Sequence, residues 1–341
     1  MIDVNSVVRE NLKNNNKINL LQLDPFGYCN AKCWFCPVKY QPAPIEGKVN
    51  MSPELLEKII ANIIEERDRP DGLVDPGFHF LYTAHYNEVL LYKHFEEMLQ
   101  ILRKYKLKTT VLSNGIPLNR ERTDIINNYQ DVVAGIALNV PAFERNVWSK
   151  RAGFAPELFD KLLSNIQYAS DTLYYLINTN NFSIQINGVN TESFNNHLTK
   201  GHFFDSLEID IDSNSGELAN QFNIAKELFP KLNIYKASYL IDRSGTVSDF
   251  ISNEQSIKNN LMSNGRQVIG CTNMGDRTTN WMHVNAAGDL FLCCNDYNFD
   301  HKFASLKDNT LREVWATDKH VEAIVHAFKT ICTKCSSAKT A

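Results

Sequence analysis

Three cysteines near the amino terminus are the side chains of this sequence best suited to chemistry. Cys29, Cys33 and Cys36 lie within eight residues, with three and then two residues between successive thiols. A loop this short can direct three sulfurs at one iron–sulfur cluster. Three ligands to a four-iron cluster leave one iron open, and an open iron is a place where a substrate or cofactor can chelate.

A zinc knuckle, or three thiols with no metal at all, is the alternative for this loop. Zinc in a closed structural site normally takes four protein ligands. No fourth cysteine or histidine stands near the three in the sequence. The ligand count therefore favours an iron–sulfur cluster.

A second set of cysteines lies near the other end of the chain. Cys271, Cys293, Cys332 and Cys335 are separated by 21, 38 and 2 residues, and a hairpin-like Gly-x4-Cys approach from Gly288 leads to the second of them. Four thiols suffice for one closed cluster. Four-cysteine sites that end in C-x2-C also hold structural zinc, so the spacing alone leaves both metals open.

One of the eight cysteines, Cys294, stands outside both sets. Neighbouring residues on a strand point to opposite faces, so only one of Cys293 and Cys294 can readily face a cluster. We assign Cys293 as the ligand because it completes the Gly-x4-Cys spacing. Cys294 is then either an inert apolar filler or a residue with chemistry of its own.

The composition is that of a globular protein. Of 341 residues, 43% are hydrophobic and 22% charged, which predicts one large α/β unit with a smaller appendage. A net charge of -4 gives no electrostatic footprint for nucleic acid. The first residues are too polar for a signal peptide and no run of about 18 apolar residues occurs, so we expect no membrane partner. We therefore expect a cytoplasmic protein, where clustered reduced thiols are more often metal ligands than disulfides.

Apolar runs and helical patterns alternate along the chain. The run over 18–23 predicts a strand that leads directly into the first cysteine loop. Ser52, Pro53 and Glu54 then predict a helix start, with apolar side chains of 55–63 on one face. Further strands are predicted at 78–82, 108–112, 132–138, 183–187 and 207–211, and further helices at 94–104 and 156–168.

Repeated strand–helix units imply a parallel sheet, which could be an open doubly wound sheet or a barrel. In both folds ligands bind at the carboxyl ends of the strands, and the first cysteine loop follows such an end. After about Asp242 the rhythm fades, so we expect one domain over 1–242 and a smaller one over 243–341. In the smaller domain, 310–315 predicts a helix with Leu311, Val314 and Trp315 on one face.

The C-x3-C-x2-C arrangement, placed after the first strand and with aromatic Phe35 before its last cysteine, resembles the radical S-adenosylmethionine (SAM) superfamily. The resemblance implies an α/β fold, a partial (β/α)6 TIM-like barrel. It also implies that Cys29, Cys33 and Cys36 hold a 4Fe–4S cluster whose open iron binds the amino and carboxylate groups of SAM. An electron from that cluster then releases a 5′-deoxyadenosyl radical, and Phe35 lies against the adenine.

Glu88 follows the second strand where the family usually has Gly-Gly-Glu-Pro, although here both Gly residues and the Pro are replaced. The resemblance implies that Glu88 accepts a hydrogen bond from the SAM ammonium, a charge-assisted contact. The alternative is a solvated loop carboxylate.

Further SAM contacts are implied at the ends of later strands. Ser113 and Asn114 resemble the segment that contacts the ribose, and Asn139 stands where the family often carries Ser and Asp. Arg151 resembles the arginine that pairs with the SAM carboxylate, for which a planar guanidinium is suited. The alternative for Arg151 is an ordinary surface arginine.

The second cysteine set resembles the twitch form of the carboxyl-terminal extension in this family, in which a β-hairpin and a following helix enclose one auxiliary 4Fe–4S cluster. The longer SPASM form carries seven cysteines and two clusters. The resemblance therefore implies SAM and two 4Fe–4S clusters as cofactors, with Cys271, Cys293, Cys332 and Cys335 as the auxiliary ligands.

An auxiliary cluster near the substrate can accept the electron left after hydrogen abstraction and deprotonation. The chain most resembles the 2-deoxy-scyllo-inosamine dehydrogenase type, which implies a two-electron oxidation of a sugar or aminocyclitol-like small molecule, with a flavodoxin- or ferredoxin-type electron donor. Three rival reactions remain: epimerisation with Cys294 as hydrogen donor, decarboxylation of a sugar acid, and maturation of a ribosomal peptide. Outside enzymology, the rival is a metal-binding scaffold.

Overall fold

Six parallel strands form the central sheet. The computed structural model describes residues 2–14, 17–39, 49–83, 86–187, 211–237, 266–272, 276–335 and 337–341. In chain order the strands are β1 (Leu20–Leu23), β2 (Phe80–Tyr82), β3 (Lys108–Ser113), β4 (Val133–Asn139), β5 (Phe182–Asn187) and β6 (Asn233–Ala237). Each of them pairs in parallel with the next along the chain.

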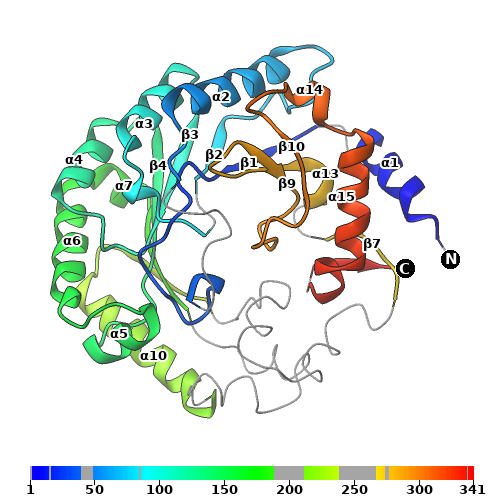
Figure 1. Cartoon of the computed structure of the whole chain (residues 1–341). Coiled ribbons are helices and arrows are strands. Elements are labelled where there is room, and N and C mark those ends of the chain that lie inside the picture. Colours follow the sequence, from blue (N-terminus) through cyan, green and yellow to red (C-terminus); the bar gives the residue numbers. More distant parts are fainter. Residues whose placement is uncertain are drawn as a thin grey trace.

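Helices cover the outer side of this sheet. They are α2 (Pro53–Asp68), α3 (Phe95–Lys104), α4 (Arg120–Asn128), α5 (Arg145–Ala152), α6 (Leu158–Thr172), α7 (Tyr174–Asn178) and α10 (Ile211–Leu228). Two short 3-10 helices, η1 (Pro37–Lys39) and η2 (Val89–Leu91), lie in the segments that follow β1 and β2. Figure 1 shows α2, α3, α4, α6 and α10 in an arc around the strands, which curve as the wall of a partial barrel. The predicted partial (β/α)6 barrel is confirmed.

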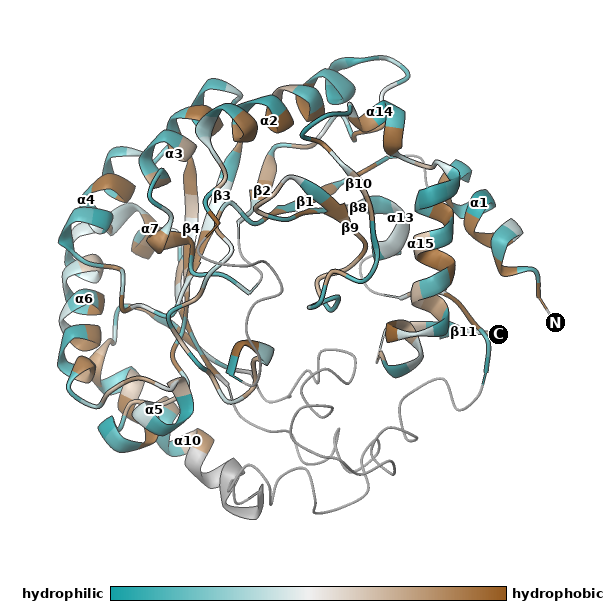
Figure 2. Cartoon of the chain, in the orientation of Figure 1, coloured by the Kyte–Doolittle hydropathy of each residue, from teal (hydrophilic) through white to brown (hydrophobic). Residues whose placement is uncertain are grey.

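The strands alternate between a face buried under the helices and a face toward the barrel interior. In β3, Val111 is fully buried whereas Thr110 is half-buried, and in β5 the same holds for Ile184 and Gln185. Figure 2 shows the matching pattern on the helices, whose hydrophobic residues turn toward the strands. Since side chains on a strand alternate with period two, one face builds the core and the other is left to line a binding site.

The predicted elements agree with the described ones within a few residues, with one exception. The Ser52 side chain caps α2 as expected, accepting a hydrogen bond from Leu55 N–H at 3.2 Å. Of the strand expected at 207–211, residues 207–210 lie outside the described ranges, and Ile211 is the first residue of α10, so that part of the prediction is wrong. The sixth strand is β6, where Asn233 and Lys236 interrupt the apolar pattern that sequence reasoning relies on.

Strands from the carboxyl-terminal part extend the barrel sheet. β8 (Trp281–Val284) pairs in parallel with β1, and β9 (Asp289–Phe291) and β10 (Lys302–Ser305) follow antiparallel to each other. β8 and β9 form the predicted hairpin, with Gly288 at φ +86° in its turn, a conformation that glycine adopts at little cost. The domain boundary expected at 242/243 lies outside the described residues.

The remaining elements of this part surround the second cysteine set. They are β7 (Val268–Cys271), which pairs with β11 (Ala338–Thr340), and the helices α13 (Arg277–Asn280), α14 (Leu311–Val314), α15 (Asp318–Lys329) and η4 (Ile331–Lys334). In Figure 1, α15 lies beside α1 (Val4–Asn14), the first helix of the chain. The helix predicted over 310–315 is α14, whose Leu311, Val314 and Trp315 are all buried.

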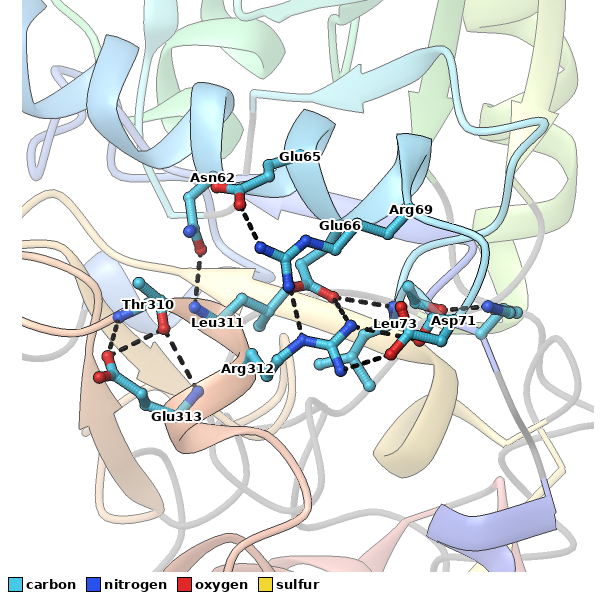
Figure 3. A network of polar contacts seen from close by, with 12 residues as sticks. Asn62, Glu65, Glu66, Arg69, Asp71, Leu73, Thr310, Leu311, Arg312 and Glu313 are labelled. Carbon is cyan, nitrogen blue, oxygen red and sulfur yellow. Dashed lines mark hydrogen bonds and ion pairs between the residues drawn. The ribbon is translucent and has the colours of Figure 1, made fainter.

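A polar joint fixes α14 to the barrel helix α2 (Figure 3). The Arg312 guanidinium donates to both carboxylate oxygens of Glu66, at 2.9 and 2.8 Å, and Leu311 N–H donates to Asn62 Oδ1 at 2.6 Å. Burial raises the pKa of Glu66, but hydrogen bonds from Arg312 and from Leu73 N–H outweigh it and hold that pKa below its ordinary value. A bidentate pair of this kind fixes the relative orientation of the two helices and also stabilises their contact.

Replacing Glu66 with Gln is expected to destabilise the fold by about 1–3 kcal/mol, because it leaves a nearly buried charged hydrogen bond incomplete. The matched control is Glu65→Gln on the same helix, which removes an exposed pair with Arg69 and is expected to cost less than about 1 kcal/mol. Chemical denaturation of both variants checks the difference. Equal losses would mean that the joint adds nothing beyond an ordinary surface pair.

Candidate functional site

The first cysteine loop leaves the carboxyl end of β1 and is held by backbone hydrogen bonds. Lys32 N–H donates to the Ala152 carbonyl and Trp34 N–H to the Arg151 carbonyl, each at 2.9 Å. Cys36 N–H donates to the Cys33 carbonyl at 2.9 Å and closes a turn that brings these two cysteines together. The last turn of α5 therefore positions the loop.

The three thiols lie close enough to influence one another, and all three are half-buried. Burial, then Glu88, raises the pKa of Cys29 to about 12, and burial together with Cys36 raises that of Cys33. A thiol that resists ionisation on its own becomes a thiolate when it binds a metal. Three neighbouring sulfurs in such surroundings fit a cluster that supplies the missing positive charge.

Gly153, the residue that ends α5, allows the close approach of the cysteine loop. It has φ +71°, and a Cβ there would lie 2.7 Å from Lys32 Cβ and 2.8 Å from the Lys32 carbonyl oxygen. Gly153→Ala is therefore expected to displace the loop and to reduce the iron bound at the first site to less than half. Iron analysis at matched protein concentration is the measurement.

Gly27→Ala is the matched control for this loop variant. A Cβ on Gly27 would make only ordinary contacts, the nearest being 3.7 Å from Val49 Cβ, so iron content is expected to stay as in the wild type. If both glycine variants kept their iron, the close approach of Gly153 to Lys32 would not be what positions the loop.

Glu88 is buried, with 1% of its surface exposed, so the alternative of a solvated loop carboxylate is wrong. One carboxylate oxygen accepts from Asn114 N–H at 2.8 Å and the other from Leu90 N–H at 3.3 Å. Burial nevertheless raises the pKa of Glu88 to about 7. Because a carboxylate has about four acceptor positions, the group can still receive a further donor.

Asn114 joins the end of β3 to the first cysteine loop. Its side-chain amide donates to Asn30 Oδ1 at 2.8 Å and also interacts with the Cys29 sulfur. Ser113 is buried at the end of β3 and its side chain hydrogen-bonds the Glu88 carboxylate. The structure therefore brings together Cys29, Glu88, Ser113 and Asn114, which come from three separate segments of the sequence.

The other predicted SAM contacts lie around this group. Arg151 is 7% exposed on α5, and its Nη1 donates to the Pro141 carbonyl at 3.3 Å, so it is no ordinary surface arginine. Phe35 is half-buried, with its ring centroid 5.7 Å from that of Trp34. Asn139 is the last residue of β4, where it is half-buried in register with Gln185 of β5.

The second cysteine set is also gathered in space. Asn295 links two of its members, since Asn295 N–H donates to Cys293 Sγ at 3.5 Å and its amide to Cys335 Sγ at 3.8 Å. Burial, then Cys335 and Cys271, raises the pKa of Cys332. Within the described ranges no three His, Cys, Asp or Glu side chains converge on a point where a single metal ion could sit.

The premise used to choose between Cys293 and Cys294 is wrong. β9 ends at Phe291, so the two cysteines occupy a turn beyond the strand and their side chains do not alternate across a sheet. Their thiols hydrogen-bond each other, and Arg277 Nη1 donates to Cys294 Sγ. Cys294 therefore lies beside the second cysteine set, and the assignment of Cys293 as the ligand stays a prediction.

Sequence reasoning missed a buried polar relay behind this set. Asp296 and His301 face each other at 3.1 Å, and His301 Nε2 lies 2.9 Å from Thr330 Oγ1, two residues before Cys332. Asp296 N–H in turn donates to the Cys293 carbonyl at 2.9 Å. The relay ties the Cys293 turn to the turn that carries Cys332 and Cys335, a link that residue spacing cannot reveal.

Tyr297 connects the two cysteine sets. It is 2% exposed, and its ring packs edge-on against the ring of Tyr86, with the two centroids 4.6 Å apart. Tyr86 stands two residues before Glu88 in the sequence. Burial is the main cause that raises the pKa of the Tyr297 hydroxyl, and the Cys36 and Cys29 sulfurs raise it further. Tyr297 is therefore within electrostatic range of the first cysteine loop. The short segment from Cys293 to Tyr297 therefore reaches from one set to the other.

A partial α/β barrel with three converging thiols at the carboxyl end of its first strand, beside a second thiol-rich site, defines a class of iron–sulfur barrel enzymes. The family model of the radical SAM superfamily matches residues 23–201, just over half of the chain, and an iron–sulfur cluster-binding domain model, SPASM, matches 271–336. The chain belongs to the radical SAM superfamily. It uses SAM with a 4Fe–4S cluster, and an auxiliary iron–sulfur cluster in its carboxyl-terminal part.

Comparisons with individual proteins support the fold. The chain is 30% identical over 113 residues to 7-carboxy-7-deazaguanine synthase of Methanothermobacter thermautotrophicus, a stretch covering 33% of this chain and 40% of that protein. SuiB of Streptococcus suis aligns over 97% of this chain and 74% of its own, at 14% identity and TM-score 0.55. BtrN in complex with AdoMet and 2-DOIA aligns over 95% and 93%, at 12% identity and TM-score 0.52. AdoMet-bound anSMEcpe aligns over 93% and 86%, at 16% identity and TM-score 0.53.

None of the helices in the described part of the chain is both long and apolar enough to span a membrane.

Proposed function

We propose that this protein is a radical SAM oxidoreductase that removes two electrons from a carbon bearing a hydroxyl or amine group in a small molecule. One observation carries the proposal: Tyr297, four residues after Cys293, packs edge-on against Tyr86, two residues before Glu88. The Cys36 and Cys29 sulfurs are near enough to raise the pKa of its hydroxyl. Such a connection puts an electron acceptor within reach of the site where hydrogen abstraction begins. A flavodoxin- or ferredoxin-type protein is the external electron donor.

The chain's own residues have separate tasks in this proposal. When bound, SAM and the two clusters supply a 5′-deoxyadenosyl radical for hydrogen abstraction and an acceptor for the remaining electron. Cys29, Cys33 and Cys36 hold the first cluster, and Glu88 receives the SAM ammonium at the buried end of β3. Phe35, Ser113, Asn114, Asn139 and Arg151 complete the SAM site as the family resemblance implies.

The barrel interior supports a small polar substrate. Side chains that alternate toward this face include Tyr82, Gln185 and Tyr235, and the Tyr235 hydroxyl donates to Gln185 Oε1 at 3.1 Å. Neutral donors and acceptors of this kind suit hydroxyl groups, which both donate and accept hydrogen bonds. They favour a sugar or aminocyclitol-like compound.

Epimerisation through Cys294 receives less support. An epimerase needs a thiol whose S–H hydrogen can be transferred to the substrate. The Arg277 guanidinium already donates a hydrogen bond to Cys294 Sγ, and Cys294 lies beside Cys293 in the second cysteine set, which leaves this sulfur engaged away from the first set.

The pH dependence of SAM binding tests the role proposed for Glu88. Because the pKa of Glu88 is raised to about 7, the carboxylate that accepts from an ammonium is lost as pH falls through that value. SAM affinity is expected to rise about tenfold per pH unit below the pKa and to level off above it. Anaerobic equilibrium dialysis measures this, and Glu88→Gln is expected to bind more weakly with a flat profile. If SAM affinity in Glu88→Gln still rose with pH as in the wild type, Glu88 would not be the acceptor for the SAM ammonium.

Product analysis tests the reaction itself. The protein, reconstituted without oxygen, is incubated with SAM, a reductant and 2-deoxy-scyllo-inosamine as the probe. The proposal predicts a ketone together with an equivalent of 5′-deoxyadenosine. Deuterium uptake from solvent without oxidation would mean epimerisation, CO2 release would mean decarboxylation, and absence of 5′-deoxyadenosine in every condition would favour a scaffold.

A further inference from the structure

A half-buried arginine lies against the second cysteine set. Arg277 is the first residue of α13, and its guanidinium carbon lies 4.1 Å from the centre of the Trp281 ring. Its Nη1 donates to Cys294 Sγ, and its charge also acts on the Cys293 and Cys271 sulfurs. The guanidinium is thus fixed between an aromatic face and three sulfurs.

Two further observations show that Arg277 is placed for a ligand. Its Nε is buried without a hydrogen-bond partner among the described residues, which is costly for a charged donor. The neighbouring carboxylate, Asp276, is engaged with Thr278, whose N–H donates to Asp276 Oδ1 at 3.1 Å and whose hydroxyl donates to the same oxygen at 2.5 Å. Asp276 Oδ1 therefore caps the amino terminus of α13 and accepts from Thr278.

A positive charge next to an iron–sulfur cluster has a known consequence. The reduced cluster carries one more negative charge than the oxidised cluster, so a nearby cation stabilises the reduced form more. Net charge and hydrogen bonds to the sulfurs are among the factors that set cluster potentials. Arg277 offers both, since its charge and its N–H groups face the sulfurs.

We propose that Arg277 raises the reduction potential of the auxiliary cluster and so makes that cluster the electron acceptor of the enzyme. Arg277 is a positioning residue, since it acts through the cluster and its cysteines. The inference rests on the proposed function only in the direction of electron flow, because the potential itself can be measured without any substrate.

The test is an EPR-monitored redox titration of the full chain with both clusters, in wild type, Arg277→Met and Arg277→Lys. Added SAM distinguishes the first cluster from the auxiliary one. Arg277→Met is expected to lower the equilibrium constant for reduction of the auxiliary cluster at least tenfold, or about 59 mV for one electron. Arg277→Lys keeps the charge and is expected to retain most of the potential. An unchanged potential in Arg277→Met would overturn the proposal.

Iron analysis and a control variant make every outcome decisive. Should Arg277→Met lose auxiliary iron, Arg277→Gln, which keeps a hydrogen-bond donor without the charge, is titrated in its place. A lowered potential in Arg277→Gln supports the proposal, and an unchanged potential there overturns it. Arg145→Met, on a partly exposed pair with Asp160, is expected to leave the potential unchanged. A failed oxidation assay with a normal Arg277 effect would reject the proposed reaction and leave this inference intact.

Discussion

Replacing Cys29, Cys33 and Cys36 together with alanine is expected to abolish formation of 5′-deoxyadenosine from SAM. These three half-buried sulfurs lie together, and the thiolates that they provide are the ligands of the first cluster in this account. Iron per chain is expected to fall from about eight to about four, because each cubane holds four irons. The remaining iron belongs to the second set.

The eighth cysteine provides the matched control for this experiment. Cys294→Ala removes a thiol that stands beside the second set and is assigned to neither cluster, so about eight irons and normal SAM cleavage are expected. If the triple variant kept its iron, or Cys294→Ala lost as much, the assignment of the sulfurs would be wrong.

Replacing Cys332 and Cys335 with alanine is expected to separate SAM cleavage from substrate oxidation. The first cysteine set remains complete, so 5′-deoxyadenosine still forms. Oxidised product is expected to fall at least about a hundredfold, equivalent to about 2.7 kcal/mol on the barrier, because no acceptor is left for the second electron. Chromatography of both products from one reaction gives the ratio.

His301→Ala is a milder variant to compare with the double replacement of Cys332 and Cys335. His301 touches Thr330 at one ring nitrogen and faces Asp296 at the other, so its loss loosens the cysteine turns without removing a sulfur. Partial loss of auxiliary iron with normal SAM cleavage is expected. Normal oxidation by the Cys332 and Cys335 variant would show that the auxiliary cluster takes no part in the reaction.

The first cysteine loop and its place after a buried strand could be predicted because both depend on neighbours in sequence. The run over 18–23 and the three thiols that follow it need only local pattern and ligand count. The capping signal at Ser52 is local as well, and α2 begins where the sequence indicates. The Thr310 cap of α14 was not predicted, although the helix itself lies within the predicted range.

Features that join distant segments could not be predicted in this way. The pairing of β8 with β1, the ring contact of Tyr297 with Tyr86, and the bond between Arg312 and Glu66 all depend on tertiary packing. Periodicity identifies which face of a strand is apolar, yet it does not say which strand lies beside it. For the same reason the sequence suggested Glu88 but not its partners on β3.

The most direct test of the account is the EPR spectrum of the reduced first cluster before and after SAM is added, recorded without oxygen. Three cysteine ligands leave one iron open, so SAM is expected to bind that iron and shift the signal, and Cys29→Ala is expected to remove the response. A wild-type spectrum that SAM leaves unchanged would contradict the central claim that the thiols of Cys29, Cys33 and Cys36 build an open cluster for SAM.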